Sequence, residues 1–206
     1  MKIYVYVDGF NLYYGCLKGT SYKWLNIQKL SQFLFPKHSI EKIKYFTAPI
    51  KIRENDSDHD KPNRQQIYFR ALRTLDCVEI INGSFLSHIV NMKLVNGKGY
   101  AKVIKTEEKG TDVNIASHII NDGYKGKYEM AVIISNDSDL VEPARIITME
   151  LKLPVVVVSP FRNNTFELKK IASFVKQIRN GVLLESQFSE TLTDKIGDFT
   201  KPESWN

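Results

Sequence analysis

Two short runs of consecutive apolar residues constrain the fold of this chain most strongly. Residues 130–135 read MAVIIS and residues 154–159 read PVVVVS, and neither run contains a charged side chain. Continuous apolar runs of this length are typical of parallel strands that are buried on both faces. They predict a central sheet with helices on both sides, because helices are what cover the two faces of a parallel sheet.

Strand and helix patterns alternate along the rest of the chain, as such a sheet requires. Alternation or β-branched residues predict further strands, and apolar residues at helical spacing predict helices, with Thr111 as an N-cap. The expected strands are residues 2–7, 43–47, 78–81 and 174–177, and the expected helices are 10–18, 27–35, 64–75, 112–121, 139–151 and 165–172.

One segment departs from this alternation. In residues 85–106, alternating side chains flank the turn sequence Asn96-Gly97-Lys98-Gly99, which predicts an inserted antiparallel ribbon. The fold class is therefore α/β: a three-layer sandwich with a mainly parallel central sheet and an inserted β-ribbon. We expect one domain over residues 1–188, followed by a loose tail over 189–206, where few side chains are apolar.

The composition narrows the classes of protein. The chain has 206 residues, of which 43% are hydrophobic, and 29 basic against 23 acidic residues give a formal charge of +6. This charge favours polyanionic partners. Two cysteines suit a reducing compartment, and we find neither a signal peptide nor a run long enough to span a membrane. We therefore expect a cytoplasmic protein without membrane partners, with a homodimer as one option.

Four aspartates fall where expected strands end or a helix begins. Asp8 ends the first strand, Asp137 and Asp139 follow the strand 130–135, and Asp112 opens a helix. In an open parallel sheet the ligand site lies beyond the carboxyl ends of the strands. Clustered carboxylates repel one another unless a cation lies between them, and an all-oxygen site suits Mg²⁺ or Mn²⁺. Taken alone, Asp137 or Asp139 could instead be a helix cap and Asp112 could serve the dipole of its helix start, whereas Asp8 is costly in a central strand unless it is paired or metal-bound.

The residues that surround these acids resemble the three signatures of the NYN domain, the LabA-like branch of the PIN-like nuclease superfamily. The matching segments are Tyr6-Val-Asp8-Gly-Phe-Asn11-Leu, Lys109-Gly-Thr-Asp112-Val and Ser135-Asn-Asp137-Ser-Asp139-Leu. The resemblance covers roughly residues 1–178. It implies a PIN-like fold and a metal-dependent endoribonuclease activity, with Asp8, Asp112, Asp137 and Asp139 on the family's acidic positions.

The resemblance also suggests roles for neighbouring side chains. Two or more of Asp8, Asp137 and Asp139 would hold Mg²⁺ directly or through water, and Asp112 would complete the ligand set or orient the attacking water. Asn11 and Ser135 fall on polar support positions, and Lys109 could neutralise the scissile phosphate. The plainer alternatives are a polar residue in a first helical turn, the polar end of a strand and a solvated lysine.

Basic residues concentrate in two segments that could contact RNA. The ribbon region 84–110 holds five lysines against two glutamates, and residues 162–179 hold five basic residues against one glutamate. We expect Lys98, Lys102, Lys105 and Arg162 to bind nucleic acid, with a solvated surface as the alternative for each. Tyr13, Tyr14 and Phe161 could stack on bases of a single strand or pack in the core.

The sequence thus favours a ribonuclease that hydrolyses phosphodiesters of single-stranded or structured RNA. A non-catalytic RNA-binding or regulatory module remains the alternative. A phosphatase with a second aspartate two positions after Asp8 is excluded, since that position is Phe10, and no dinucleotide-binding or Walker A motif occurs.

Overall fold

A six-stranded parallel sheet forms the centre of the computed structural model, which describes residues 1–52, 56–161 and 166–205. The strand order is β3-β2-β1-β6-β7-β8, and every neighbouring pair is parallel. The strands are β1 (Lys2–Asp8), β2 (Ser39–Thr47), β3 (Val78–Asn82), β6 (Met130–Ile134), β7 (Val155–Ser159) and β8 (Phe174–Gln177). The predicted α/β class is confirmed.

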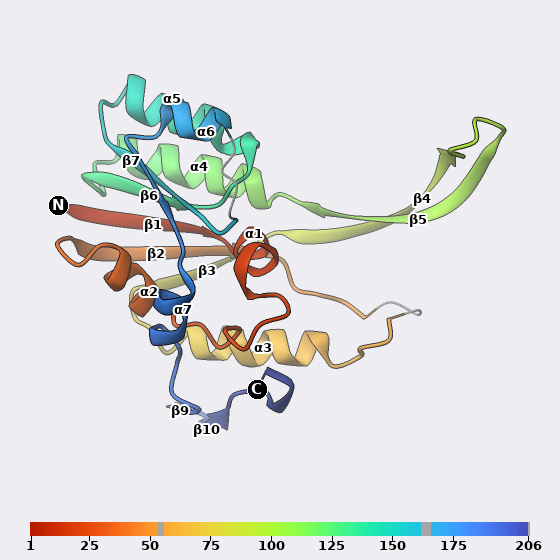
Figure 1. Cartoon of the computed structure of the whole chain (residues 1–206), viewed down its shortest axis with the longest axis horizontal. Helices are drawn as coiled ribbons and strands as arrows, with labels where there is room; N and C mark the ends of the chain where they lie inside the picture. The colour runs from red at the N-terminus through yellow and green to blue at the C-terminus, as the bar shows by residue number, and fades with distance from the viewer. Residues whose placement is uncertain (53–55, 162–165, 206) are drawn as a thin grey trace.

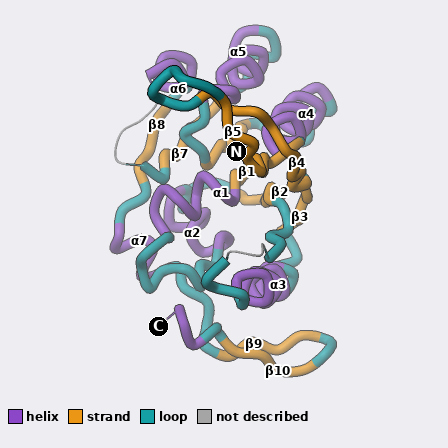
Figure 2. Tube along the Cα trace, turned by 90° about the vertical axis from the view of Figure 1, so that its right-hand side faces the viewer, coloured by secondary structure: helices purple, strands orange, loops and turns teal. Residues whose placement is uncertain are grey.

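Helices cover both faces of this sheet (Figure 1). Figure 2 shows α4 (Thr111–Tyr124), α5 (Val141–Met149) and α6 (Phe166–Ile171) on one face. The other face carries α1 (Gly9–Leu12), a π-helical turn over Tyr13–Leu17, α2 (Ile27–Leu34), α3 (Lys61–Leu72) and α7 (Asn180–Glu185). No helix among the described residues is long and apolar enough to cross a membrane.

Side chains of β1 alternate between two hydrophobic cores, one on each face. Val5 and Val7 pack with residues such as Leu30 and Leu72, whereas Tyr6 packs with Ile115 on the other side. All five residues of β6 and all five of β7 are buried, as the two apolar runs predict. The centre of the sheet is therefore packed against helices on both faces.

The predicted ribbon is present and is longer than expected. β4 (Ser84–Lys93) pairs antiparallel with β5 (Tyr100–Lys109) and extends away from the body of the protein (Figure 1). Gly97 and Gly99 in its turn have φ values of 72° and 104°, which only glycine adopts without strain. The base of the ribbon leads directly into α4, so the ribbon and the sheet edge are joined by one short connection.

Several helix boundaries differ from the expected ones for local reasons. α3 begins at Lys61 instead of residue 64, because Pro62 is well tolerated in a first helical turn. The expected helix 139–151 is a 3₁₀ turn (Ser138–Leu140) followed by α5. Thr111 is the first residue of α4 and not its cap, since Gly110 occupies the cap position with a φ of 90°.

The C-terminal segment is folded, so the expectation of a loose tail was wrong. β9 (Thr191–Asp194) and β10 (Gly197–Thr200) form a hairpin, and a 3₁₀ turn follows over Glu203–Trp205. Arg70 of α3 donates two hydrogen bonds of 2.7 Å to Asp194, and the Phe199 ring lies 6.4 Å from that of Trp24. A few long-range contacts anchor this segment, and such contacts leave no periodic signal in the sequence.

Replacement of Phe199 by Ala tests this anchoring. Phe199 is 8% exposed, so the change should lower the free energy of unfolding by roughly 3 kcal/mol, as for other buried phenylalanines. Ile196→Ala in the turn of the same hairpin is the matched control, because Ile196 is 85% exposed and its loss should cost less than about 0.5 kcal/mol. Urea denaturation measures both, and equal small effects would mean that the segment is loose.

Candidate metal centre

Three aspartates meet at the carboxyl edge of the sheet, between β1 and β6. Asp8 is the last residue of β1, Asp137 lies three residues after β6, and Asp112 is the second residue of α4. One carboxylate oxygen from each of them lies within 4.8 Å of the others. The strand order reverses between β1 and β6, and ligands of open parallel sheets bind at such a point.

Two glycines permit the backbone conformations that position Asp8 and Asp112. Gly9 follows Asp8, and a Cβ there would lie 2.7 Å from the Tyr45 ring and 2.8 Å from the Phe46 carbonyl oxygen. Gly110, which precedes α4, has a left-handed φ of 90°. Any other residue would strain the turn that aims Asp112 at the sheet edge.

Hydrogen bonds hold Asp8 and Asp137 in a fixed relation. The Ser135 hydroxyl donates to Asp8 Oδ2 at 3.0 Å and accepts the Asp137 N–H at 3.1 Å. Asn11 Oδ1 accepts the backbone N–H of Asn136 at 2.8 Å, which ties α1 to the loop after β6. Asn11 and Ser135, expected as polar supports, therefore connect the two strand ends.

Two of the aspartates also cap helices. Asp8 accepts the Asn11 N–H at 2.9 Å, and Asp137 accepts the Asp139 N–H at 2.9 Å. For Asp137 this is the capping alternative that the sequence offers, and Asp8 has the same role. A cap uses one lone pair of a carboxylate, and asparagine caps about as well as aspartate. Capping alone therefore does not account for three carboxylates in one place.

The carboxylates of this centre are electrostatically disfavoured. Burial raises the pKa of Asp8 to about 6, with the charges of Asp112 and Asp137 adding to the rise, against hydrogen bonds from Asn11 and Ser135 that lower it. Burial and the charges of Asp137 and Asp139 also raise the pKa of Asp112. In the described part of the chain, no basic side chain forms an ion pair with Asp8, Asp112 or Asp137. A bound cation would remove this repulsion.

One acid beside this centre, Glu108, is not among the residues that the sequence predicts for the site. Glu108 of β5 lines the same cavity of about 230 Å³ as the three aspartates and accepts a hydrogen bond from the Thr111 hydroxyl. Burial raises the pKa of Glu108, and the charges of Asp8 and Asp112 add to the rise. Glu108 directly precedes the Lys109-Gly-Thr-Asp112 motif, which was a sequence signal for a role in the site. Its position at the base of the ribbon follows only from where β5 ends, which the sequence does not predict.

The structure separates other expected site residues from the three-aspartate group. Asp139 is exposed and lies outside that group, although its charge acts on Asp112. Lys109 forms an ion pair with Glu107 at 3.1 Å.

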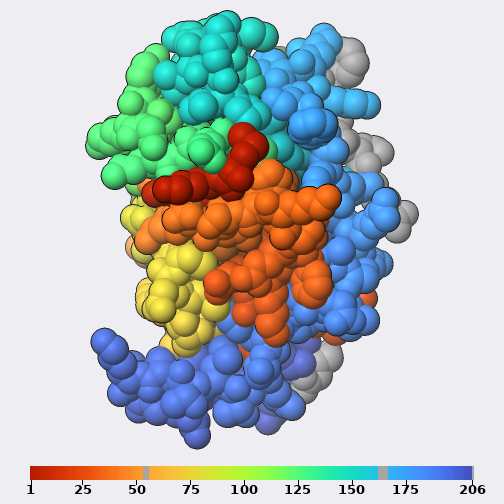
Figure 3. Space-filling model, turned by 90° about the vertical axis from the view of Figure 1, so that its left-hand side faces the viewer, coloured from red at the N-terminus to blue at the C-terminus, as the bar shows by residue number. Residues whose placement is uncertain are grey.

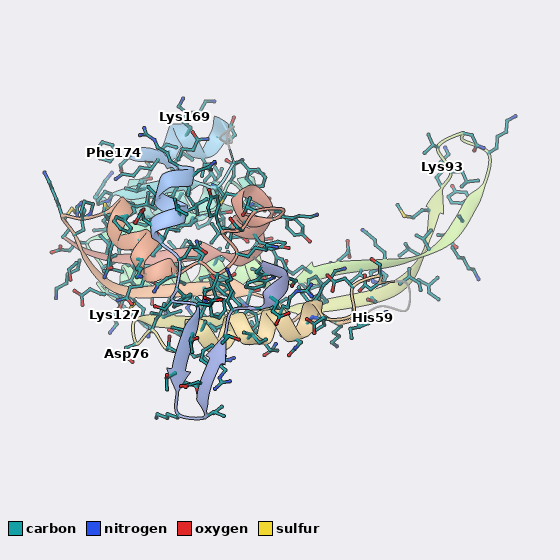
Figure 4. The ribbon with its side chains drawn as sticks, turned by 60° about the horizontal axis from the view of Figure 1, so that its bottom comes forward. His59, Asp76, Lys93, Lys127, Lys169 and Phe174 are labelled. Atoms are coloured by element: carbon teal, nitrogen blue, oxygen red, sulfur yellow. The ribbon has the colours of Figure 1, made fainter. Side chains whose placement is uncertain are left out.

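The expected nucleic-acid contacts lie mostly on the ribbon. Lys98 is in its turn, Lys102 is on β5 and Lys105 pairs with Glu107; the label of Lys93 in Figure 4 marks how far the ribbon reaches. Phe161 and Tyr14 line the acidic cavity. Arg162 lies outside the described residues.

The chain is an α/β protein whose parallel sheet carries a group of acids at its central carboxyl edge. The sequence model of the NYN domain matches residues 2–178, and the chain belongs to the NYN domain family. This family lies in a nuclease-like superfamily, and the three acids are compatible with a divalent metal site.

The similar proteins include a curated relative and a protein of known structure. The 6-hydroxy-3-succinoylpyridine 3-monooxygenase of Pseudomonas putida is 30% identical, in an alignment that spans the whole chain and 75% of that protein. A crystal structure of a protein of unknown function from Vibrio parahaemolyticus has a TM-score of 0.54 at 19% identity, with 87% of this chain and 93% of that one covered. The second similarity supports the fold alone.

The raised pKa of Asp8 predicts how stability depends on pH without metal. An unfolded aspartate has a pKa near 4, so between about pH 4 and pH 6 the folded state binds more protons and stability falls as the pH rises. In EDTA, the free energy of unfolding of the wild-type protein should therefore fall by roughly 2–3 kcal/mol relative to that of Asp8→Asn across this window. Above about pH 6 the difference between the two proteins should stay constant.

Chemical denaturation at pH 4, 5, 6 and 7.5 measures this difference. Asp76→Asn is the matched control, since Asp76 is exposed and far from the centre (Figure 4). If the free energy of unfolding depended on pH in the same way for wild type and Asp8→Asn, the burial and repulsion assigned to Asp8 would be contradicted.

Proposed function

We propose that this protein is a metal-dependent ribonuclease that hydrolyses RNA phosphodiesters at the three-aspartate centre. The observation that carries the proposal is the approach of three carboxylate oxygens to within 4.8 Å at the carboxyl edge of the sheet. Such an approach is unfavourable unless a cation is bound there. Membership of a nuclease-like family supports phosphodiester hydrolysis as the use of that cation.

The donor set fits Mg²⁺ or Mn²⁺, because it consists of carboxylate oxygens without histidine or cysteine. Asp8, Asp112 and Asp137 would hold the ion, and Asp139 is the proposed fourth acid at the exposed rim. When bound, such an ion polarises a phosphoryl oxygen and lowers the pKa of a coordinated water.

The remaining side chains act around the ligands. Ser135 and Asn11 keep Asp8 and the loop of Asp137 in register through the hydrogen bonds described above. Glu108 lines the same cavity, burial raises its pKa, and it would accept a proton from an attacking water. Lys109 would have to leave Glu107 to reach a phosphate.

Two alternatives compete with this proposal. A non-catalytic RNA-binding or regulatory module would keep the acids for cation binding alone. The name of the Pseudomonas putida relative suggests a small hydroxypyridine as substrate. A cavity of about 760 Å³ that shares Phe10 and Tyr14 with the acidic cavity supports this second candidate. A cytoplasmic location and a homodimer stay predictions.

Asp137→Asn should abolish cleavage while leaving the fold intact. The amide keeps the cap but loses the charge, so activity should fall by at least about a hundredfold. A mixed panel of RNA and DNA, with Mg²⁺, Mn²⁺ or EDTA, measures cleavage. Asp76→Asn and a mock purification are the controls.

Divalent metal should raise the unfolding temperature of the wild-type protein. Binding to the folded state alone stabilises it by about 2.7 kcal/mol at a hundredfold excess over the dissociation constant. Asp137→Asn should lose most of this stabilisation. Full cleavage by Asp137→Asn would refute the proposed role of the centre, and metal binding without cleavage of any substrate would favour the non-catalytic module.

RNA binding should weaken steeply with salt because the proposed contacts are lysines on the ribbon. Each contact to a single-stranded phosphate contributes roughly 0.7 to the slope of log affinity against log salt. Replacement of Lys98, Lys102 and Lys105 by Ala should therefore reduce the slope by about 2. Fluorescence anisotropy in the Asp137→Asn background measures it.

The matched control replaces Lys37, Lys125 and Lys127, which are equally exposed. These lysines belong to the loops before β2 and β6, at the amino edge of the sheet that Figure 3 views directly. A slope that falls with this control set, and not with the ribbon set, would place the RNA on the opposite side of the molecule.

A further inference from the structure

A second and larger cavity lies directly beside the acidic centre. Its volume is about 760 Å³, within the range of small-molecule sites in proteins. Its lining residues come from α1 and the π-helical turn, the end of β2, the loop after it, α3, the base of the ribbon and the C-terminal turn. Phe10 and Tyr14 line both cavities, so they form a shared wall between them.

Among the described residues, eight aromatic side chains line this cavity. Phe10 and Phe85 meet edge to face with ring centres 5.6 Å apart, and Trp205 of the C-terminal turn lies 6.0 Å from Tyr68. Phe10, Phe85 and Trp205 are only partly buried, which leaves ring surface available to a ligand. The aromatic lining residues are Phe10, Tyr13, Tyr14, Tyr45, Tyr68, Phe69, Phe85 and Trp205. We call this space the aromatic cavity.

The charges around the aromatic cavity favour an anionic ligand. Five basic residues line it against two acidic ones, and the Lys18 ammonium lies 5.0 Å from the centre of the Tyr14 ring. Arg64 is held in place by Asp58 and Asp60, at 2.5 Å and 3.2 Å. The basic lining residues are Lys18, Lys23, Lys51, Lys61 and Arg64.

Part of the cavity wall is fixed before any ligand arrives. Gln65 Oε1 accepts the Ile50 N–H at 2.8 Å, and Gln65 Nε2 donates to the Ala48 carbonyl at 3.1 Å. These two bonds attach the segment after β2 to α3. Pre-organised walls reduce the entropy lost on binding, which favours affinity for a rigid planar ring.

We propose that the aromatic cavity binds the nucleobase of a nucleotide whose phosphate lies at the three-aspartate centre. The proposal rests on the proposed function for the phosphate, while the ring site rests on the cavity itself. Aromatic walls accept any base through its flat face, and the shared wall of Phe10 and Tyr14 places the ring next to the acids. The recognised chemistry is a planar heteroaromatic ring with an adjacent anionic group.

Titration calorimetry with AMP and UMP in Mg²⁺ tests the ring site without any cleavage, because neither molecule contains an internucleotide phosphodiester. Phe85→Ala removes a wall that belongs to the aromatic cavity and not to the acidic one. It should weaken binding roughly 5- to 150-fold, the range expected for one stacking residue, about 1–3 kcal/mol. Trp205→Ala, on the opposite wall, should have a similar effect and guards against a local distortion of the ribbon.

Phe174→Ala is the matched control, because Phe174 is 68% exposed on β8, away from the aromatic cavity (Figure 4). It should bind as wild type does. The same titrations with 6-hydroxy-3-succinoylpyridine distinguish a nucleotide from a small aromatic acid as the source of the ring.

Nucleotide binding that both cavity variants weaken supports the proposal, including when no RNA is cleaved with Mg²⁺ or Mn²⁺, in which case only the proposed function fails. Absence of nucleotide binding, or binding that neither variant changes, overturns the proposal even if RNA is cleaved. Preference for the hydroxypyridine, with the same dependence on Phe85 and Trp205, overturns the assignment to a nucleobase and supports the second candidate function.

Discussion

Parallel pairing of β1 with β6 is the constraint on which the candidate site depends. Val7 pairs with Ile134 in this register, so the two strands end side by side and their following residues leave the sheet at the same edge. Both strands are buried between helical layers, which prevents a slip of register without exposing apolar side chains. The sheet therefore brings Asp8 and the start of the Asp137 loop together, and the hydrogen bonds of Ser135 and Asn11 fix that loop.

The position of Asp112 depends on a buried polar network behind the site. The Lys44 ammonium of β2 lies 2.5 Å from Asp122 Oδ2, and the Tyr6 hydroxyl of β1 donates to the same oxygen at 2.9 Å. Lys44 also lies 3.0 Å from His118 Nδ1. Asp122 and His118 belong to α4, so the network holds that helix against two strands and thereby aims its N-terminus at the sheet edge.

The sequence predicts much of this arrangement and misses what long-range contacts create. The apolar runs at 130–135 and 154–159 are interpreted correctly because burial on both faces leaves a local pattern. Asp8 and Asp137 are predictable as neighbours, since both follow central strands. Glu108 and the folded C-terminal segment are not, because the length of the ribbon and the contact of Arg70 with Asp194 bring together residues far apart in the chain.

The central claim is that a divalent cation binds between Asp8, Asp112 and Asp137. Crystals of the wild-type protein soaked in Mn²⁺ and measured for anomalous scattering test it most directly. The account predicts an anomalous peak within coordination distance of all three carboxylates, and its loss in Asp137→Asn crystals treated identically. Well-ordered carboxylates without a peak between them, at Mn²⁺ concentrations that support any activity of the protein, would contradict it.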